Sequence, residues 1–151
     1  MPLNIVLIEP EIPNNTGNIG RLSLASGSRL HLVKPFGFEI TDKRLKRAGL
    51  DYWKHVELHT YENIDEFFEK NEVSKMAFLS SHGEKDYLEI PFQDDLFLVF
   101  GKESKGLPKS ITEKFKNQLY KISIHSKNIR SLNLSNAVSI VVYEGLRRLG
   151  A

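Results

Sequence analysis

Hydrogen-bonding side chains are concentrated in the segment RSLNLSN, residues 130–136, directly before a strongly apolar stretch. The segment holds two serines and two asparagines, among them Ser131 and Asn133, although one such side chain would suffice to cap a helix. Residues 137–143 are nearly all apolar, which is more than a helix with one buried face requires. These features predict a binding site at the start of a helix that is covered on most sides, by the core or by a partner subunit.

A second polar segment, EPEIPNNTGNIGR, occupies residues 9–21 after the first apolar run. Its two prolines, three asparagines and two glycines predict a shaped turn that leads into a helix. One interpretation is an ordinary loop in which Asn15 or Thr16 caps that helix. The other is that helix N–H groups, asparagine amides and Arg21 together hold a phosphate or a ribose. The segment contains neither G-x-G-x-x-G nor a P-loop pattern, so a dinucleotide site or a P-loop is unsupported.

A third segment, LVFGKESKGLP at residues 98–108, is an apolar strand that ends in a loop between Gly101 and Gly106. Ligands of open α/β sheets bind at such carboxyl ends of strands. The glycines would let the backbone approach a ligand closely, and Glu103 would place a carboxylate beside it. A turn of solvated charges is the alternative.

The elements that must position these segments alternate along the chain. Apolar runs predict strands at residues 3–8, 30–33, 76–80, 96–100 and 119–124. Helix-like stretches lie at residues 16–26, 42–48, 64–71, 109–117 and 132–149, with Gly27 closing the first and Asp42 and Gly49 bounding the second. This alternation predicts the α/β class, with a mostly parallel sheet and helices on both of its faces.

Composition narrows the classes of protein that fit. The 151 residues predict one domain, and no apolar run reaches the roughly 18 residues that a membrane span needs. The N-terminus has no secretory signal, so a cytoplasmic location is expected. The absence of cysteine excludes thiolate metal sites, and the five histidines show no metal-ligand spacing, so no metal is predicted.

The charges are unevenly distributed around a net charge of +2. Residues 29–54 hold seven Lys or Arg against three acids, and residues 121–151 hold five against one. Residues 57–95 hold eleven acids against three basic residues. One interpretation of these runs is that they form solvated helix faces. The other is that two basic segments converge on a polyanion.

Four segments together resemble the motifs of the SPOUT methyltransferases, and more narrowly those of the YibK-like branch, the tRNA (cytidine/uridine-2′-O-)-methyltransferases. They are PEIPNNTGNIGR, DKRLKRAGLDYW, FGKESKGLP and RSLNLSNAVSIVVYE, and the resemblance spans about residues 5–149. It implies a C-terminal deep trefoil knot, an exception to the rule that chains avoid knots, and a homodimer formed through the C-terminal helix region. It also implies S-adenosylmethionine as the cofactor, bound bent within the knot.

The resemblance assigns roles residue by residue. Contacts to the cofactor fall on Leu79, Gly101, Ile124 and Ser131. RNA binding and catalysis fall on Asn15, Arg21, Glu103 and Asn133. The chain departs from the family at His125 and Ser126, where relatives usually have Pro-Met, which leaves the cofactor loop less rigid.

The implied activity is S-adenosylmethionine-dependent 2′-O-methylation of tRNA at the wobble nucleotide of the anticodon loop. One domain would then recognise the anticodon stem-loop without a separate RNA-binding domain. A guanidinium stays protonated, so Arg21 would clamp a phosphate and stabilise the forming alkoxide, oriented with the ribose by Asn15 and Asn133. Two alternatives stay open: methylation of another RNA such as ribosomal RNA, and a catalytically silent RNA-binding or assembly protein. Tyr52 and Trp53 would stack on an unpaired base, or else form a core or dimer contact.

Overall fold

A computed structural model describes residues 2–38 and 52–151 of the chain. The helix expected at residues 42–48, with its bounding residues Asp42 and Gly49, lies outside the described residues.

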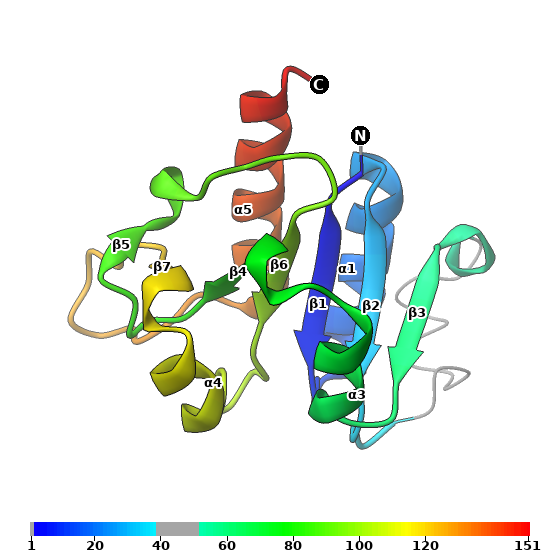
Figure 1. The fold of residues 1–151 in the computed structure, drawn as a ribbon, viewed down its shortest axis with the longest axis horizontal. Coiled ribbons are helices and arrows are strands. Elements are labelled where there is room, and N and C mark those ends of the chain that lie inside the picture. Colours follow the sequence, from blue (N-terminus) through cyan, green and yellow to red (C-terminus); the bar gives the residue numbers. More distant parts are fainter. Residues whose placement is uncertain (1, 39–51) are drawn as a thin grey trace.

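Within the described residues, seven parallel strands form a single sheet in the order β3-β2-β1-β6-β4-β7-β5 (Figure 1). Their bounds are β1 Asn4–Ile8, β2 Arg29–Val33, β3 Leu58–Tyr61, β4 Met76–Leu79, β5 Lys85–Asp86, β6 Phe97–Phe100 and β7 Leu119–Lys121. The predicted α/β class with a parallel sheet is confirmed. The trefoil knot stays a prediction.

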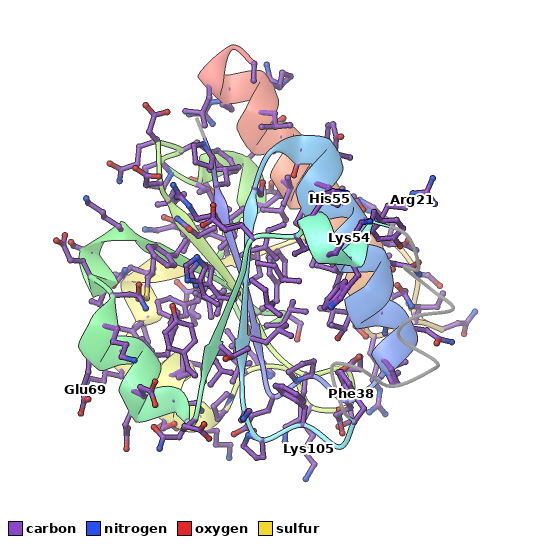
Figure 2. The ribbon with its side chains drawn as sticks, turned by 90° about the vertical axis from the view of Figure 1, so that its right-hand side faces the viewer. Arg21, Phe38, Lys54, His55, Glu69 and Lys105 are labelled. Carbon is purple, nitrogen blue, oxygen red and sulfur yellow. The ribbon has the colours of Figure 1, made fainter. Side chains whose placement is uncertain are left out.

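Helices cover both faces of this sheet, as predicted. The helices are α1 Pro13–Ser26, α3 Ile64–Lys70, α4 Lys109–Lys114 and α5 Leu134–Leu149, and the short 3-10 turns are η1 Trp53–His55, η2 Val73–Lys75, η3 Tyr87–Glu89 and η4 Lys116–Gln118. Figures 1 and 2 show α1 and α5 together on one face and α3 and α4 on the other.

The core consists of two apolar layers, one on each side of the sheet. Successive side chains of a strand point to opposite faces, so Ile5 and Leu7 join the layer beneath α1 and α5. Val6 and Ile8 join the other layer, with Phe67 of α3. Because β1 lies between β2 and β6 and is covered on both faces, all five of its residues are buried. This double burial explains why the strand is an uninterrupted apolar run after Asn4.

Two strands have no counterpart among the predicted ones. β3 reads LHTY, with two exposed polar residues at the edge of the sheet, and β5 has only two residues. Neither presents the apolar run that marks a buried strand. All predicted strands and helices that fall within the described residues are present in the structure, with ends shifted by a few residues.

The predicted start of the first helix is wrong. Helix α1 begins at Pro13, three residues before Thr16, because proline at the first helical position already has the required backbone angle. Asn15 and Thr16 therefore lie inside the helix, and the Thr16 hydroxyl is buried with no hydrogen-bond partner in the described part of the chain. Neither residue is the cap. The predicted end is correct, since Gly27 closes α1 with a φ of 67°.

Helix α5 is covered by the core on one side only. Val138, Val141 and Val142 are buried against the sheet. Ile140 and Tyr143 keep 37% and 48% of their surface exposed. Within one chain the helix is therefore not covered on most sides, and a covering partner stays a prediction.

A buried polar network links β1, β2 and β3 around His31. Its Nδ1 lies 2.8 Å from the Tyr61 hydroxyl, and its Nε2 lies 2.9 Å from Oδ1 of Asn4. The Asn4 amide nitrogen donates to the backbone oxygen of Asp95, so Oδ1 is the atom left to accept from Nε2–H. Burial, followed by the charge of His59 stacked 4.8 Å away, lowers the pKa of His31 to about 3. His31 is therefore a neutral imidazole in the folded protein.

This network makes the stability of the fold depend on pH. In the unfolded chain His31 has an ordinary pKa near 6.5, so the unfolded state takes up the proton first as pH falls. The free energy of unfolding should decrease from about pH 6.5 towards pH 3, by at most about 1.4 kcal/mol per pH unit from this group. Urea unfolding of wild type and His31→Gln at a series of pH values measures the effect, and the variant should show a shallower dependence. His55→Gln, which changes an exposed histidine, should keep the wild-type slope. Equal slopes for wild type and His31→Gln would contradict the assignment.

Candidate active site

A cavity of about 610 Å³ lies among the loops that follow β4, β6 and β7, beside the start of α5. This is the carboxyl end of a parallel sheet, where α/β proteins bind ligands, and the volume suits a small organic molecule. All four residues that the resemblance assigns to the cofactor line this cavity: Leu79, Gly101, Ile124 and Ser131. Of the four assigned to RNA binding and catalysis, three line it: Asn15, Glu103 and Asn133.

The loop after β6 is folded tightly on itself at Gly101. A Cβ atom on Gly101 would lie 2.1 Å from the carbonyl carbon of Gly106 and 2.2 Å from the backbone nitrogen of Leu107. Gly106 adopts a φ of 69° and donates its N–H to the Lys102 carbonyl at 2.8 Å. We expected both glycines to let the backbone approach a ligand. Glycine is also required at position 101 for a structural reason, because no larger residue fits where the loop backbone closes.

Glu103 connects this loop to the beginning of α1. One carboxylate oxygen accepts the N–H of Glu11 at 2.8 Å, and the other accepts the N–H of Ile12 at 2.9 Å and the Asn15 amide at 3.2 Å. Ile12 is the residue before α1 and has no side-chain cap, so the carboxylate supplies negative charge where the helix dipole favours it. Glu103 therefore fixes the position of its loop against the helix.

Asn15 and Asn133 continue the connection to α5. The Asn133 amide nitrogen donates to Oδ1 of Asn15 at 3.2 Å. Oδ1 of Asn133 accepts the backbone N–H of Ser135 at 2.9 Å and the Ser135 hydroxyl at 2.6 Å, so Asn133 is the N-cap of α5. The capping role and the site role considered for this segment thus belong to the same side chain. We call the hydrogen-bonded series Glu103, Asn15 and Asn133 the carboxylate–amide chain.

Arg21 does not belong to the carboxylate–amide chain and does not line the cavity. It lies on the exposed side of α1, six residues beyond Asn15 and therefore about 9 Å further along the helix axis. Its guanidinium stands 5.6 Å from the ring centroid of Tyr52, and Figure 2 shows it near Lys54 and His55. The amide of Asn15 is bonded to Glu103 and Asn133 instead, so the structure does not show the expected orientation of Arg21 by these two asparagines.

Trp53 is a core contact and not a platform for a base. A Cβ atom on Gly20 would lie 2.2 Å from the Trp53 ring, so the indole packs directly on the backbone of α1. Tyr52 beside it donates its hydroxyl to the Gly17 carbonyl at 3.4 Å and lies under Arg21. Of the two aromatic residues, Tyr52 is the one associated with a candidate functional side chain.

Sequence reasoning missed two charged residues of this region. Arg130 lines the cavity and is the first residue of the RSLNLSN segment, where its charge beside a polar cluster was an available signal. Glu11 accepts the N–H of Ser104 at 2.9 Å, and no local pattern distinguishes it from any other loop acid.

Within residues 2–38 and 52–151, no group of three or more histidine, aspartate or glutamate side chains is placed to hold a metal ion. No helix in the same ranges is both long and apolar enough to cross a membrane.

A parallel sheet with a cavity at its carboxyl edge, closed by three polar loops, defines an α/β ligand-binding enzyme fold. The chain belongs to the SpoU rRNA Methylase family, whose model matches residues 2–143. The predicted family resemblance is therefore confirmed.

Curated relatives and a solved structure agree with the family. A Saccharophagus degradans protein named tRNA (cytidine(34)-2′-O)-methyltransferase is 48% identical over 149 residues, which cover 97% of this chain and 96% of the relative. An Escherichia coli K12 protein of the same name is 46% identical over 149 residues, covering 98% and 94%. A solved structure concerned with the 2-OH methylation of C/U34 on tRNA has a TM-score of 0.90 and 40% identity, covering 98% of this chain and 96% of that one.

Proposed function

We propose that this protein transfers a methyl group from S-adenosylmethionine to the 2′-hydroxyl of the wobble nucleotide of tRNA, a cytidine or a modified uridine. Relatives that are 46% and 48% identical carry the name of this reaction at cytidine 34. The observation that carries the proposal is the carboxylate–amide chain along the cavity. It joins into one site three of the four segments that resemble the family's motifs.

The cavity suits the cofactor by its size and by the chemistry of its walls. Its lining combines apolar side chains such as Leu79 and Ile124 with backbone around Gly101 and with the Ser131 hydroxyl. We assign these four residues to the cofactor, with apolar surface for an aromatic base and polar groups for a ribose. When bound, S-adenosylmethionine supplies an electrophilic methyl group on a positively charged sulfur.

The protein's own residues contribute position and charge. In the proposed reaction the sulfur–methyl bond breaks as the methyl–O2′ bond forms, and the hydroxyl proton passes to a phosphate or to water. Asn15, Asn133 and Glu103 form a rigid edge against which the ribose is held, and such orientation is worth several kcal/mol. Arg21 lies outside the cavity, and its guanidinium is assigned to clamping a phosphate of the RNA, which fixes the RNA relative to the ribose edge.

We assign RNA recognition to the surface around α1 and η1. Arg21 and Lys54 lie near one another on the outer side of α1 and η1, with His55 beside them, and offer two cations to a phosphate backbone (Figure 2). We place this RNA-binding activity in the cytoplasm, on the anticodon stem-loop of tRNA.

We also propose that two copies of the chain associate through α5. Ile140 and Tyr143 are three residues apart on this helix, so they share one side of it, and both are partly exposed. A second copy would cover this apolar surface. Tyr143→Glu should convert the dimer into a monomer, because a carboxylate would be desolvated at the interface. Light scattering coupled to size exclusion measures the mass, with Ser110→Glu, at an exposed position of α4 on the other face of the sheet, as the control. A wild-type protein that elutes as a monomer at micromolar concentration would refute the dimer.

The reaction itself is tested by mass mapping of ribose methylation. In a strain that lacks this gene, nucleotide 34 of its substrate tRNA should lose its 2′-O-methyl group, and purified protein with S-adenosylmethionine should restore it. An unchanged nucleotide 34 would refute the tRNA assignment. Loss of a methyl group from ribosomal RNA in the same map would identify the other RNA as the substrate. Cofactor binding by calorimetry without transfer to bulk tRNA or ribosomal RNA would instead indicate a silent RNA-binding protein.

The role of Arg21 is tested by Arg21→Lys. Lysine keeps the charge but loses the planar pair of donors that binds a phosphate in bidentate fashion, so kcat should fall by about 100-fold. The measurement is single-turnover methylation of tRNA together with tRNA affinity. Lys116→Arg exchanges the same two residue types at an exposed position of η4 and should leave both values at wild type. Wild-type turnover with unchanged affinity in Arg21→Lys would show that bidentate positioning by Arg21 is not used.

A further inference from the structure

The loop before α1 and the loop after β6 hold each other through two exchanged carboxylates. Glu103 of the second loop accepts the N–H groups of Glu11 and Ile12 in the first. In return Glu11 accepts the N–H of Ser104, at 2.9 Å. Each acid therefore binds the backbone of the segment that carries the other acid. This reciprocal arrangement fixes both the distance between the two loops and their relative rotation, which one contact alone would leave free.

We infer that Glu11 is a positioning residue for the cofactor, because its contact with Ser104 fixes where residues 102–105 lie relative to the cavity. This inference rests on the proposed function and adds to it a residue that touches neither methyl donor nor ribose. Ser104 lines the cavity directly, whereas Glu11 does not. Glu11 therefore acts on the cavity wall through the backbone of Ser104.

Neighbouring groups keep the Glu11 carboxyl ionised and oriented towards the loop after β6. The hydrogen bonds from Ser104, followed by the charges of Lys102 and Lys105, hold the pKa of Glu11 below its ordinary value. Lys102 is itself held by Glu9, with Nζ 3.4 Å from the carboxylate. Glu9 adopts a φ of 52°, a conformation that non-glycine residues seldom use, so the chain turns sharply just before Glu11. Two successive acids of the same turn thus contact two residues of the same loop.

The arrangement also ties the cavity to α1. Glu11 lies two residues before Pro13, the first residue of the helix that carries Asn15 and Arg21. Glu103 by itself holds the first turn of this helix, through the N–H of Ile12 and the amide of Asn15. Loss of the Glu11 carboxylate should therefore change the cavity wall at Ser104 and leave Asn15 and Arg21 in place.

The experiment compares wild type, Glu11→Ala, Glu11→Gln and the control Glu69→Gln. Glu69 is an exposed acid on α3, on the opposite side of the sheet from α1 (Figure 2). Calorimetry gives the Kd of S-adenosylhomocysteine, methylation kinetics give KM for the cofactor and for tRNA, and thermal unfolding gives global stability. Glu11→Ala should weaken S-adenosylhomocysteine and raise KM for the cofactor about tenfold, with KM for tRNA within about twofold of wild type. Glu11→Gln keeps an oxygen that accepts from Ser104 and should return both values to within about threefold of wild type. Glu69→Gln should match wild type throughout.

Three results would overturn the inference. The first is a Glu11→Ala protein whose affinity for S-adenosylhomocysteine equals that of Glu69→Gln. The second is a Glu11→Ala protein that loses cofactor affinity, tRNA affinity and thermal stability in parallel, which indicates a general structural role. The third is a Glu11→Gln protein as weak as Glu11→Ala, which excludes the hydrogen bond to Ser104 as the cause. If wild type binds no S-adenosylhomocysteine, the proposed function fails as well. If wild type binds cofactor and methylates tRNA normally, any of the three results removes only the role of Glu11.

Discussion

The site depends on a single carboxylate, that of Glu103, placed between two neighbouring strands. β1 and β6 are parallel and paired in register, with Leu7 opposite Phe100, so the loops that leave their carboxyl ends meet. Backbone N–H groups at that junction precede α1 and have no helical partner. Glu103 satisfies those of Glu11 and Ile12 at once. Charge, helix dipole and hydrogen-bond geometry all favour this placement, which makes it the fixed point of the cavity wall.

The Glu103 carboxylate determines how the amide groups of the neighbouring asparagines are oriented. Glu103 as a carboxylate can only accept, so Asn15 must turn its NH₂ group towards it and its oxygen away. That oxygen then requires a donor, which is the NH₂ group of Asn133. The oxygen of Asn133 is left to accept from Ser135 and cap α5. Glu103 thus determines the orientation of the Asn15 amide, and Asn15 determines that of Asn133. Asn133 in turn caps α5, which begins 31 residues after Glu103.

The sequence predicted the parts of this structure that depend on local pattern. The buried strands were visible because both faces of each are apolar, whereas β3 was not, because it lies at an edge with two polar residues exposed. Asn133 was identified because a helix start is a local event. Gly101 was indicated by its place at the start of a glycine-flanked loop after a strand, whereas Leu79 is one apolar residue among many in a strand, and only the family resemblance indicated it. Glu11 could not be found, because its partner Ser104 is 93 residues away and donates a backbone N–H.

The separation between Arg21 and the cavity shows how the two halves of the site are related. Asn15 and Arg21 lie on the same helix, six residues apart, and the helix cannot change that spacing without breaking its hydrogen bonds. The helix is in turn held at three places: by Glu103 at its start, by Trp53 packed on Gly20, and by Gly27 at its end. If Arg21 binds a phosphate and Asn15 contacts the ribose, as proposed, the same rigid helix positions both groups. Selectivity for a folded RNA over a free nucleotide would then follow, because a single nucleoside is too short to occupy both positions.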